Sequence, residues 1–185
     1  MEYLRVDDDI HLEKLGKSHA ETIFKIIDHD RPYLRKWLPF VDQTRQVKDT
    51  RQFIASLCSP VNRDKNAIYL IWYRGEPAGL AGFKEIDIIN HKTEIGYWLT
   101  EHLQGKGIVT RTVTKLFDFG FRNMKMNRIQ IKVAVGNEKS KAIPRRMGLF
   151  FEGIERAGEW HTDRYHDLDI FSMLKSEWVD RLLKP

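Results

Sequence analysis

The sequence predicts a mixed α/β fold of the α+β kind, with one sheet of about seven strands flanked by helices. Two patterns carry this prediction. Short apolar runs with the two-residue alternation of strands recur along the chain, and segments with an apolar residue every three or four positions stand between them. Because strand and helix patterns alternate along the chain without a linker or repeat, we expect one domain spanning residues 1–185.

The first strand and the first helices are marked by alternation, by a cap and by prolines. Ile10–Leu15 alternates as a half-buried strand does, and Ser18 to Glu21 read as a capping box that opens a helix ending near His29. Arg31–Asp42 carries two prolines and is expected to be irregular or to form short helical turns. Residues 47–57 predict a second helix. Its expected buried residues are Val47, Phe53, Ile54 and Leu57.

Three strands follow in the middle of the chain. Ala67–Tyr73 and Ala78–Lys84 flank Arg74-Gly75-Glu76-Pro77, which is a hairpin turn signal. Lys92–Leu99 is the next apolar run and predicts the third of these strands.

A helix is expected after the glycine-rich turn at residues 104–107, because the apolar residues beyond it fall on one helical face. These residues are Val109, Val113, Leu116, Phe117, Gly120 and Phe121. Arg128–Val135 alternates as a strand, and Ser140–Met147 predicts a short helix in which Pro144 lacks an amide. The remaining expected elements are the strands Phe150–Glu155 and Asp167–Leu174 and a terminal helix at Lys175–Leu183.

Composition favours a cytoplasmic protein with no membrane association. The chain has one cysteine, Cys58, which fits a reducing compartment, and no apolar run approaches the roughly 20 residues of a membrane span. The N-terminus lacks the order of a signal peptide. Thirty-one basic against 26 acidic side chains suit an acidic ligand, although a solvated surface of mixed charge explains them as well. No direct nucleic-acid binding is expected, because aromatic residues do not interleave with the basic ones.

The glycine-rich turn at residues 104–110, Gln-Gly-Lys-Gly-Ile-Val-Thr, is typical of anion binding. Gly105 and Gly107 let the backbone approach an anion without a Cβ, and the amides of the following first helical turn supply donors with about half a positive charge. The turn is neither a P-loop nor a dinucleotide fingerprint, which needs a third glycine where Thr110 stands. An ordinary strand-to-helix connection is the alternative.

Several motifs occur in the order that one enzyme family shows. Gln104–Val109 matches Gln-x-x-Gly-x-Gly/Ala with Val109 at the final small position, and residues 137–140 and 148–153 match Asn-x-x-Ser and Gly-Phe-x-x-Glu-Gly with Leu149 in place of Phe. Arg31–Phe40, Glu94–Leu99 and residues 167–174 match further segments. From about residue 10 to residue 174 the chain therefore resembles the GNAT acyltransferases, and within them the RimJ/RimL-like branch of ribosomal-protein N-terminal acetyltransferases.

The resemblance implies a mostly antiparallel sheet in which the central strands Lys92–Leu99 and Arg128–Val135 splay apart. Acetyl-CoA is the implied cosubstrate, with its pantetheine in the opening, and no metal is implied. The residues implied to hold it are Tyr97, Trp98, Leu99, Gln104, Gly105, Lys106, Gly107, Ile108, Val109, Thr110, Asn137 and Ser140. Lys106 and Arg111 would add positive charge, although each also reads as a surface residue, and Asn137 reads equally as a helix N-cap.

Acyl transfer requires a neutral amine and a proton for the departing thiolate. An α-amine with a pKa near 7.8 costs only about 1 kcal/mol to deprotonate at pH 7, against about 4.6 kcal/mol for a lysine near 10.4. Glu94 is the candidate general base and Ser140 the candidate acid; the alternatives are a solvent-facing strand-end glutamate and a serine that only caps the backbone. Positioning and backbone oxyanion donors are a further alternative source of rate.

The acceptor pocket is expected to be bordered by Trp160, His161 and Tyr165, on a loop before the last strand, with Trp37 on the other side. Ordinary packing is the alternative for each. The nearby Asp163 and His166 bring no metal-binding spacing with them, so no metal site is expected.

The sequence thus predicts an N-acetyltransferase that acts on a protein N-terminal α-amine, with a ribosomal protein as the implied partner. Two alternatives stay open. In the first, the acceptor is a small amine such as a polyamine, amino acid or aminoglycoside. In the second, the protein is a CoA-binding regulator or ribosome-associated factor without turnover. A homodimer is implied only at the level of the family.

Overall fold

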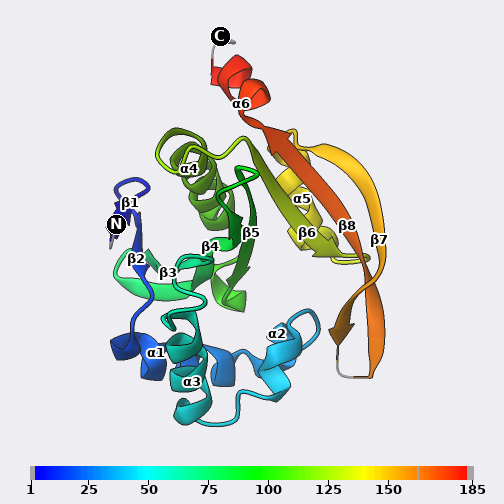
Figure 1. The fold of residues 1–185 in the computed structure, drawn as a ribbon. Helices are drawn as coiled ribbons and strands as arrows, with labels where there is room; N and C mark the ends of the chain where they lie inside the picture. The colour runs from blue at the N-terminus through cyan, green and yellow to red at the C-terminus, as the bar shows by residue number, and fades with distance from the viewer. Residues whose placement is uncertain (1–2, 162, 183–185) are drawn as a thin grey trace.

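The protein, represented by a computed structural model that describes residues 3–161 and 163–182, is built on one eight-stranded sheet (Figure 1). The strand order is β1-β2-β3-β4-β5-β6-β8-β7, and only β5 and β6 run parallel. The strands are β1 (Tyr3–Arg5), β2 (Ile10–Lys14), β3 (Ala67–Tyr73), β4 (Glu76–Asp87), β5 (Lys92–Leu99), β6 (Arg128–Ala134), β7 (Phe150–His161) and β8 (Arg164–Leu174). The predicted mostly antiparallel sheet is confirmed, and β1 is one strand more than expected because three residues are too few to show alternation.

Helices stand between the strands, as the alternating patterns predict. Those of the described residues are α1 (Ala20–His29), α2 (Arg31–Leu34), α3 (Val47–Leu57), α4 (Ile108–Arg122), α5 (Glu138–Arg146) and α6 (Lys175–Leu182), with 3-10 helices at Lys17–His19, Pro39–Asp42 and Glu101–Leu103. The last residue of the terminal helix expected from sequence, Leu183, lies outside the described residues. None of the helices in the described part of the chain is long and apolar enough to cross a membrane.

The two faces of the sheet carry different helices and two separate apolar clusters. The first cluster packs α4 against β3, β4, β5 and β6, and the one-sided apolar pattern of α4 predicts it correctly. The second cluster packs α1 and α3 against the other face of β3 and β4. Figure 1 shows β6, β8 and β7 at the right of the view, away from α1 and α3.

Two details of the first helices differ from the sequence-based expectation. Ser18 does not cap α1, because residues 17–19 form a 3-10 helix and α1 begins at Ala20. The amide of Gly16 donates instead to His19 Nδ1 at 3.0 Å. Phe53 is 45% exposed, because α3 turns Thr50 and Ile54 rather than this ring toward the sheet.

The C-terminal hairpin is longer than predicted. The segment expected to be a loop before the last strand is the end of a β-hairpin, in which Glu159 pairs with His166 and Trp160 with Tyr165. Most side chains at this end are exposed on both faces, so the sequence lacks the apolar alternation by which half-buried strands are recognised.

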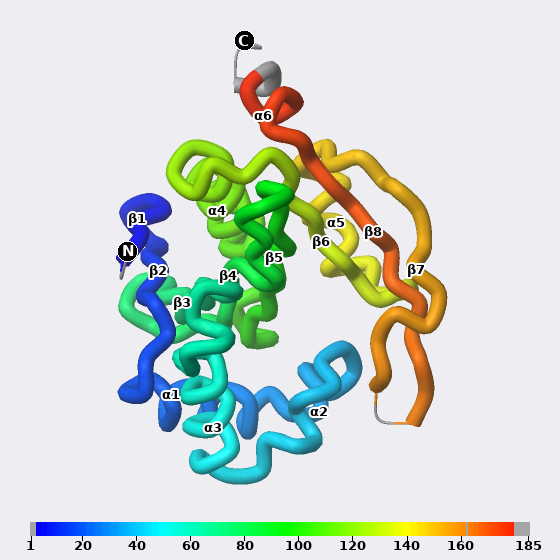
Figure 2. The backbone as a smooth tube through the Cα atoms, in the orientation of Figure 1, coloured from blue at the N-terminus to red at the C-terminus, as the bar shows by residue number. Residues whose placement is uncertain are grey.

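The parallel pair β5 and β6 forms a fork. Only three residue pairs join the two strands, and the last of them is Glu94 with Gln130. Beyond it, residues 95–99 of β5 stay paired with β4, and residues 131–134 of β6 stay paired with β8. Figure 2 shows the two strands diverging as they run toward α2. The predicted splay is therefore present.

Candidate active site

The glycine-rich turn follows β5 at the open end of the fork. Gly105 and Gly107 have φ angles of 75° and 71°, in the left-handed region that glycine tolerates without strain. A Cβ on either residue would meet no atom within 4 Å, so the approach to the turn is open. Gly107 is the N-cap of α4 and supplies no side-chain cap, which leaves the first amides of the helix for another acceptor.

Side chains connect this turn to α5 and α2. Gln104 donates from its amide to the hydroxyl of Tyr33, and its Oε1 accepts a hydrogen bond of 2.9 Å from Lys139 Nζ. At the other end of the turn, Thr110 Oγ1 accepts a bond of 3.0 Å from an Arg146 guanidinium nitrogen. The element after β5 is thus tied to the helix after β6, across the opening of the fork.

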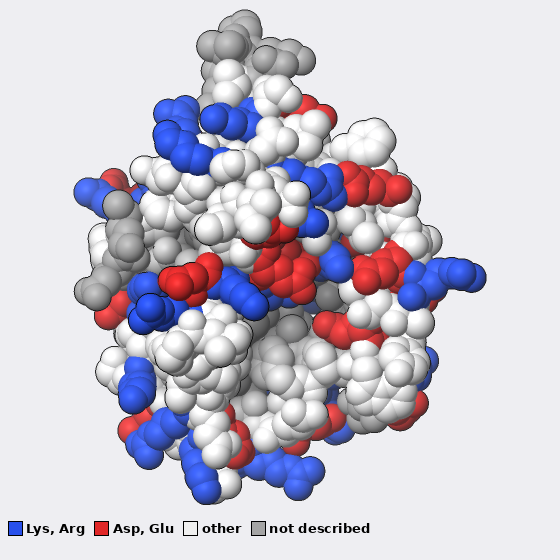
Figure 3. Space-filling model, in the orientation of Figure 1, with Lys and Arg blue, Asp and Glu red and all other residues white. Residues whose placement is uncertain are grey.

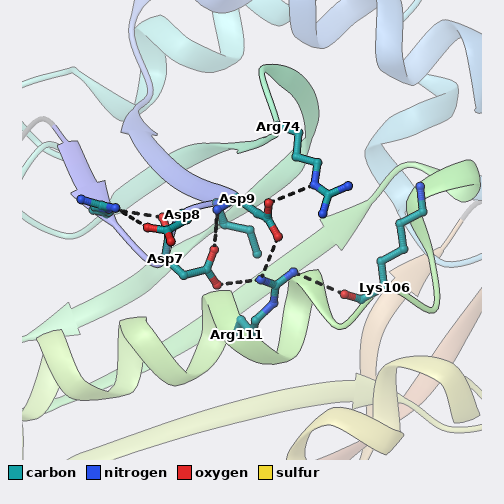
Figure 4. Close-up of polar contacts among 8 residues, drawn as sticks. Asp7, Asp8, Asp9, Arg74, Lys106 and Arg111 are labelled. Carbon is teal, nitrogen blue, oxygen red and sulfur yellow. Dashed lines mark hydrogen bonds and ion pairs between the residues drawn. The ribbon is translucent and has the colours of Figure 1, made fainter.

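Arg111 reaches the turn, because its guanidinium donates a hydrogen bond of 3.4 Å to the Lys106 carbonyl, but its charge is paired with two carboxylates. Its guanidinium lies 2.7 Å from Asp7 Oδ2 and 3.7 Å from Asp9 Oδ2, in a cluster that Arg74 completes (Figure 4). The bond from Arg74 holds the pKa of Asp9 below its ordinary value. Lys106 extends away from this cluster, and its Nζ lies 5.7 Å from the ring centroid of Tyr73.

Ser140 lies in the first turn of α5 and contacts Tyr97 of β5. Asn137 is the N-cap of α5 and accepts a bond of 3.2 Å from the Ser140 amide, so its capping role is observed. The Tyr97 hydroxyl donates to the Ser140 carbonyl at 3.0 Å and accepts from Ser140 Oγ at 3.3 Å. Pro144 explains the first bond, because it has no N–H to offer the carbonyl four residues earlier. Burial raises the pKa of Tyr97, so its hydroxyl keeps its proton.

Glu94 occupies the apex of the fork. It is 5% exposed, and its two carboxylate oxygens face Lys84 Nζ at 2.6 Å and Gln130 Nε2 at 3.4 Å. Since side chains alternate along a strand, Glu94 points to the face opposite to that of Tyr97 and Ser140. The two predicted catalytic residues therefore approach the fork from opposite sides of the sheet.

Five of the expected cofactor-binding residues have side chains in or against the apolar clusters. Leu99 and Ile108 are buried in the first cluster, Tyr97 and Val109 pack against it, and Trp98 packs against the second.

The comparison with known families decides the enzyme class. A model described as an acetyltransferase (GNAT) domain matches residues 9–149. The chain belongs to the GNAT acetyltransferases.

Three similar acetyltransferases align with this chain over nearly its whole length. Bacillus subtilis (strain 168) YdaF, provisionally named a ribosomal N-acetyltransferase, is 35% identical over 94% of this chain and 96% of its own. The structure of RimL, a ribosomal L7/L12 α-N-protein acetyltransferase in complex with coenzyme A, has a TM-score of 0.88 at 27% identity and covers 94% of this chain and 98% of that one. The microcin C7 self-immunity acetyltransferase MccE, solved with acetyl-CoA and AMP, has a TM-score of 0.86 at 30% identity and covers 92% and 95%. The resemblance to the RimL-like branch is confirmed.

In this GNAT acetyltransferase the residues predicted to border the acceptor pocket lie at the end of the β7–β8 hairpin and next to α2. Trp160 and Tyr165 are 54% and 63% exposed and pack edge to face at the end of the β7–β8 hairpin. His161 is 6% exposed, with its ring 5.1 Å from that of His166. Trp37, which follows α2, lies beside the turn after β6, where a Cβ on Gly136 would stand 3.9 Å from its ring.

Figure 3 shows the molecular surface in the orientation of Figure 1. Acidic and basic side chains lie across its middle, and a hollow lies below them, toward α2. Salt bridges join charged side chains of different strands of the sheet, including Lys84 of β4 with Glu94 of β5 and Lys132 of β6 with Glu155 of β7. Within residues 3–161 and 163–182, no cluster of three or more His, Cys, Asp or Glu is arranged to hold a metal ion.

Sequence reasoning did not assign three residues to the glycine-rich turn that contact it in the structure. Tyr33 and Lys139 hold Gln104, and Arg146 holds Thr110. The only available signal was the spacing of seven between Lys139 and Arg146, which places them on one side of a helix.

Proposed function

We propose that this acetyltransferase uses acetyl-CoA to acetylate the N-terminal α-amine of a protein, with a ribosomal protein as the first candidate acceptor. The names of YdaF and RimL support the acceptor class. The structure of RimL with coenzyme A and that of MccE with acetyl-CoA support the cosubstrate.

The observation that carries the proposal is the fork with the glycine-rich turn at its open end. Residues 95–99 of β5 and 131–134 of β6 present strand edges without a ladder between them, and such edges accept an extended amide-containing chain. The turn offers open amides at the N-terminus of α4 for a diphosphate. The residues present therefore fit acetyl-CoA, which when bound supplies a thioester carbonyl for attack and a thiolate leaving group.

Ser140 is proposed to donate a proton or hydrogen bond to the departing sulfur. Its hydroxyl is half-buried on the α5 side of the fork, where its long contact of 3.3 Å to Tyr97 leaves it free to reorient. Tyr97 acts as a positioning residue, because its own proton is used on the Ser140 carbonyl. Asn137 fixes the helix turn that carries Ser140 and keeps its side-chain NH₂ for a ligand carbonyl.

Glu94 is proposed as the general base on the opposite side of the fork, acting directly or through a water. Its place at the last β5–β6 pair puts it where the two strands separate. Lys84 and Gln130 fix both carboxylate oxygens, which orients the group. An α-amine requires only the modest cost of about 1 kcal/mol to lose its proton at pH 7, so one oriented carboxylate suffices.

The acceptor is proposed to approach over the hollow between α2 and the β7–β8 hairpin. The exposed pair of Trp160 and Tyr165 and the ring of Trp37 offer apolar surface for the first residues of a peptide. A small-molecule acceptor is the second candidate, because MccE has a similar fold and was solved with AMP.

The test is a coenzyme A release assay with acetyl-CoA and three acceptor sets: peptides with free N-termini, the same peptides with blocked N-termini, and a panel of small amines. We expect release only with the free α-amines. Release with the small amines alone would assign the enzyme to the second candidate function.

A further inference from the structure

Two cations of α5 bond to neutral oxygens at the two ends of the glycine-rich turn. Lys139 Nζ contacts Gln104 Oε1 at 2.9 Å, and Arg146 contacts Thr110 Oγ1 at 3.0 Å. Lys139 and Arg146 are seven residues apart, so both project from the same side of α5, about 10 Å apart along its axis. The residues between their two partners, 105–109, carry the amides of the proposed diphosphate site.

The other two cations of α5 are already paired with carboxylates. Lys141 contacts Asp169 and Glu138, and Arg145 lies 3.1 Å from Glu138 Oε2. In the described part of the chain neither Lys139 nor Arg146 contacts a carboxylate; beyond its hydrogen bond, Lys139 only lies over the ring of Tyr33.

This difference decides which cations are available to an anion. A cation bonded to a carboxylate has to break an ion pair before it binds a phosphate, whereas one bonded to an amide or hydroxyl oxygen exchanges a neutral acceptor for a charged one. A phosphate adds a direct charge–charge attraction that the neutral oxygens of Gln104 and Thr110 do not offer. Lys139 and Arg146 therefore gain by moving to a phosphate placed between Gln104 and Thr110.

We propose that Lys139 and Arg146 bind the coenzyme diphosphate from the α5 side, opposite to the backbone amides of the turn. The proposal rests on the proposed function, since it names further residues for the same cosubstrate. It also gives α5 a second role, because the helix that carries Ser140 toward the thioester end would hold the phosphate end as well.

The experiment measures the Kd of coenzyme A and of dephospho-CoA by calorimetry, for the wild type and for Lys139→Gln, Arg146→Gln and Arg145→Gln. Glutamine removes the charge and retains an N–H donor on a shorter side chain. Arg145→Gln removes the same charge from the neighbouring position, where Glu138 already holds it, and is the matched control.

We expect Lys139→Gln and Arg146→Gln each to raise the Kd of both ligands about tenfold and to make the Kd less dependent on salt. We expect Arg145→Gln to keep both Kd values within about twofold of the wild type. Equal Kd values for all three variants, or losses as large in Arg145→Gln, would overturn the inference. A loss confined to coenzyme A would also overturn it, because the 3′-phosphate that dephospho-CoA lacks would then be the ligand. Failure of the wild type to bind either compound would instead refute the proposed function.

Discussion

Replacing Gly107 by alanine separates the backbone requirement of the turn from its role in binding. At φ 71° a Cβ is disfavoured by about 1–2 kcal/mol, and since no atom lies within 4 Å there is no clash to add. Gly75, in the β3–β4 turn, has φ 81° and equally open surroundings, so Gly75→Ala should cost the same. For a chain of 185 residues this corresponds to a melting temperature lower by about 2–8 °C in both variants.

Only Gly107→Ala should change ligand binding. A methyl group in the open approach to the α4 amides would displace the diphosphate from donors that contribute about 1.5–3 kcal/mol each, so the Kd for coenzyme A should rise at least about tenfold. Calorimetry gives the Kd, and thermal unfolding with and without coenzyme A gives the two stabilities. Equal Kd values for Gly107→Ala and Gly75→Ala would refute the assignment of the turn as the phosphate site.

Three further predictions test the acid, the support of α5 and the role of Arg111. Ser140→Ala should lower kcat at least about tenfold with little change in the KM for acetyl-CoA, and unchanged kcat would remove Ser140 from the mechanism. Lys141→Met should lower the free energy of unfolding by about 3 kcal/mol, because it leaves the buried Asp169 unpaired. The Asp169 contact raises the pKa of Lys141 above 10.5, so the stabilisation is present below that pH and is lost as the pH rises through the higher folded-state pKa; a stability difference from Lys141→Met that stays constant into this range would contradict it. Arg111→Met should keep the Kd for coenzyme A within about twofold, because the Arg111 charge is held by Asp7. It should lower the free energy of unfolding by under about 1 kcal/mol, because this ion pair is partly exposed. A tenfold weaker Kd would show that Arg111 contributes to the phosphate site.

The fold was largely readable because its elements carry local signals. Helix α4 and strands β3 to β6 are buried on one or both faces. Their apolar residues therefore recur with the period of the helix or strand, which can be recognised in the sequence. The tip of the β7–β8 hairpin has no such burial, and the pairing of Trp160 with Tyr165 depends on the register of two strands rather than on either segment alone. Ser18 failed as a cap because a 3-10 turn precedes α1.

For the candidate site, sequence located the segments and the tertiary structure located the partners. The glycine-rich turn, Asn137 and Ser140 were found by residue type and spacing, since positive φ angles and caps are local properties. That Arg111 pairs with Asp7, more than a hundred residues earlier in the chain, could not be found in this way. A cation has no local preference among distant acceptors.

The sequence by itself determined the enzyme family, the order of the strands and helices along the chain, and the place of the glycine-rich turn, because these depend on short motifs, short-range periodicity and backbone conformation. Only the tertiary structure decided that β5 and β6 separate after Glu94 and Gln130. It also decided that the Tyr97 hydroxyl donates to the Ser140 carbonyl, which Pro144 cannot do, and that Lys139 of α5 contacts the glycine-rich turn. These contacts join segments that are distant in the chain, and their geometry is set by how the sheet and the helices pack together.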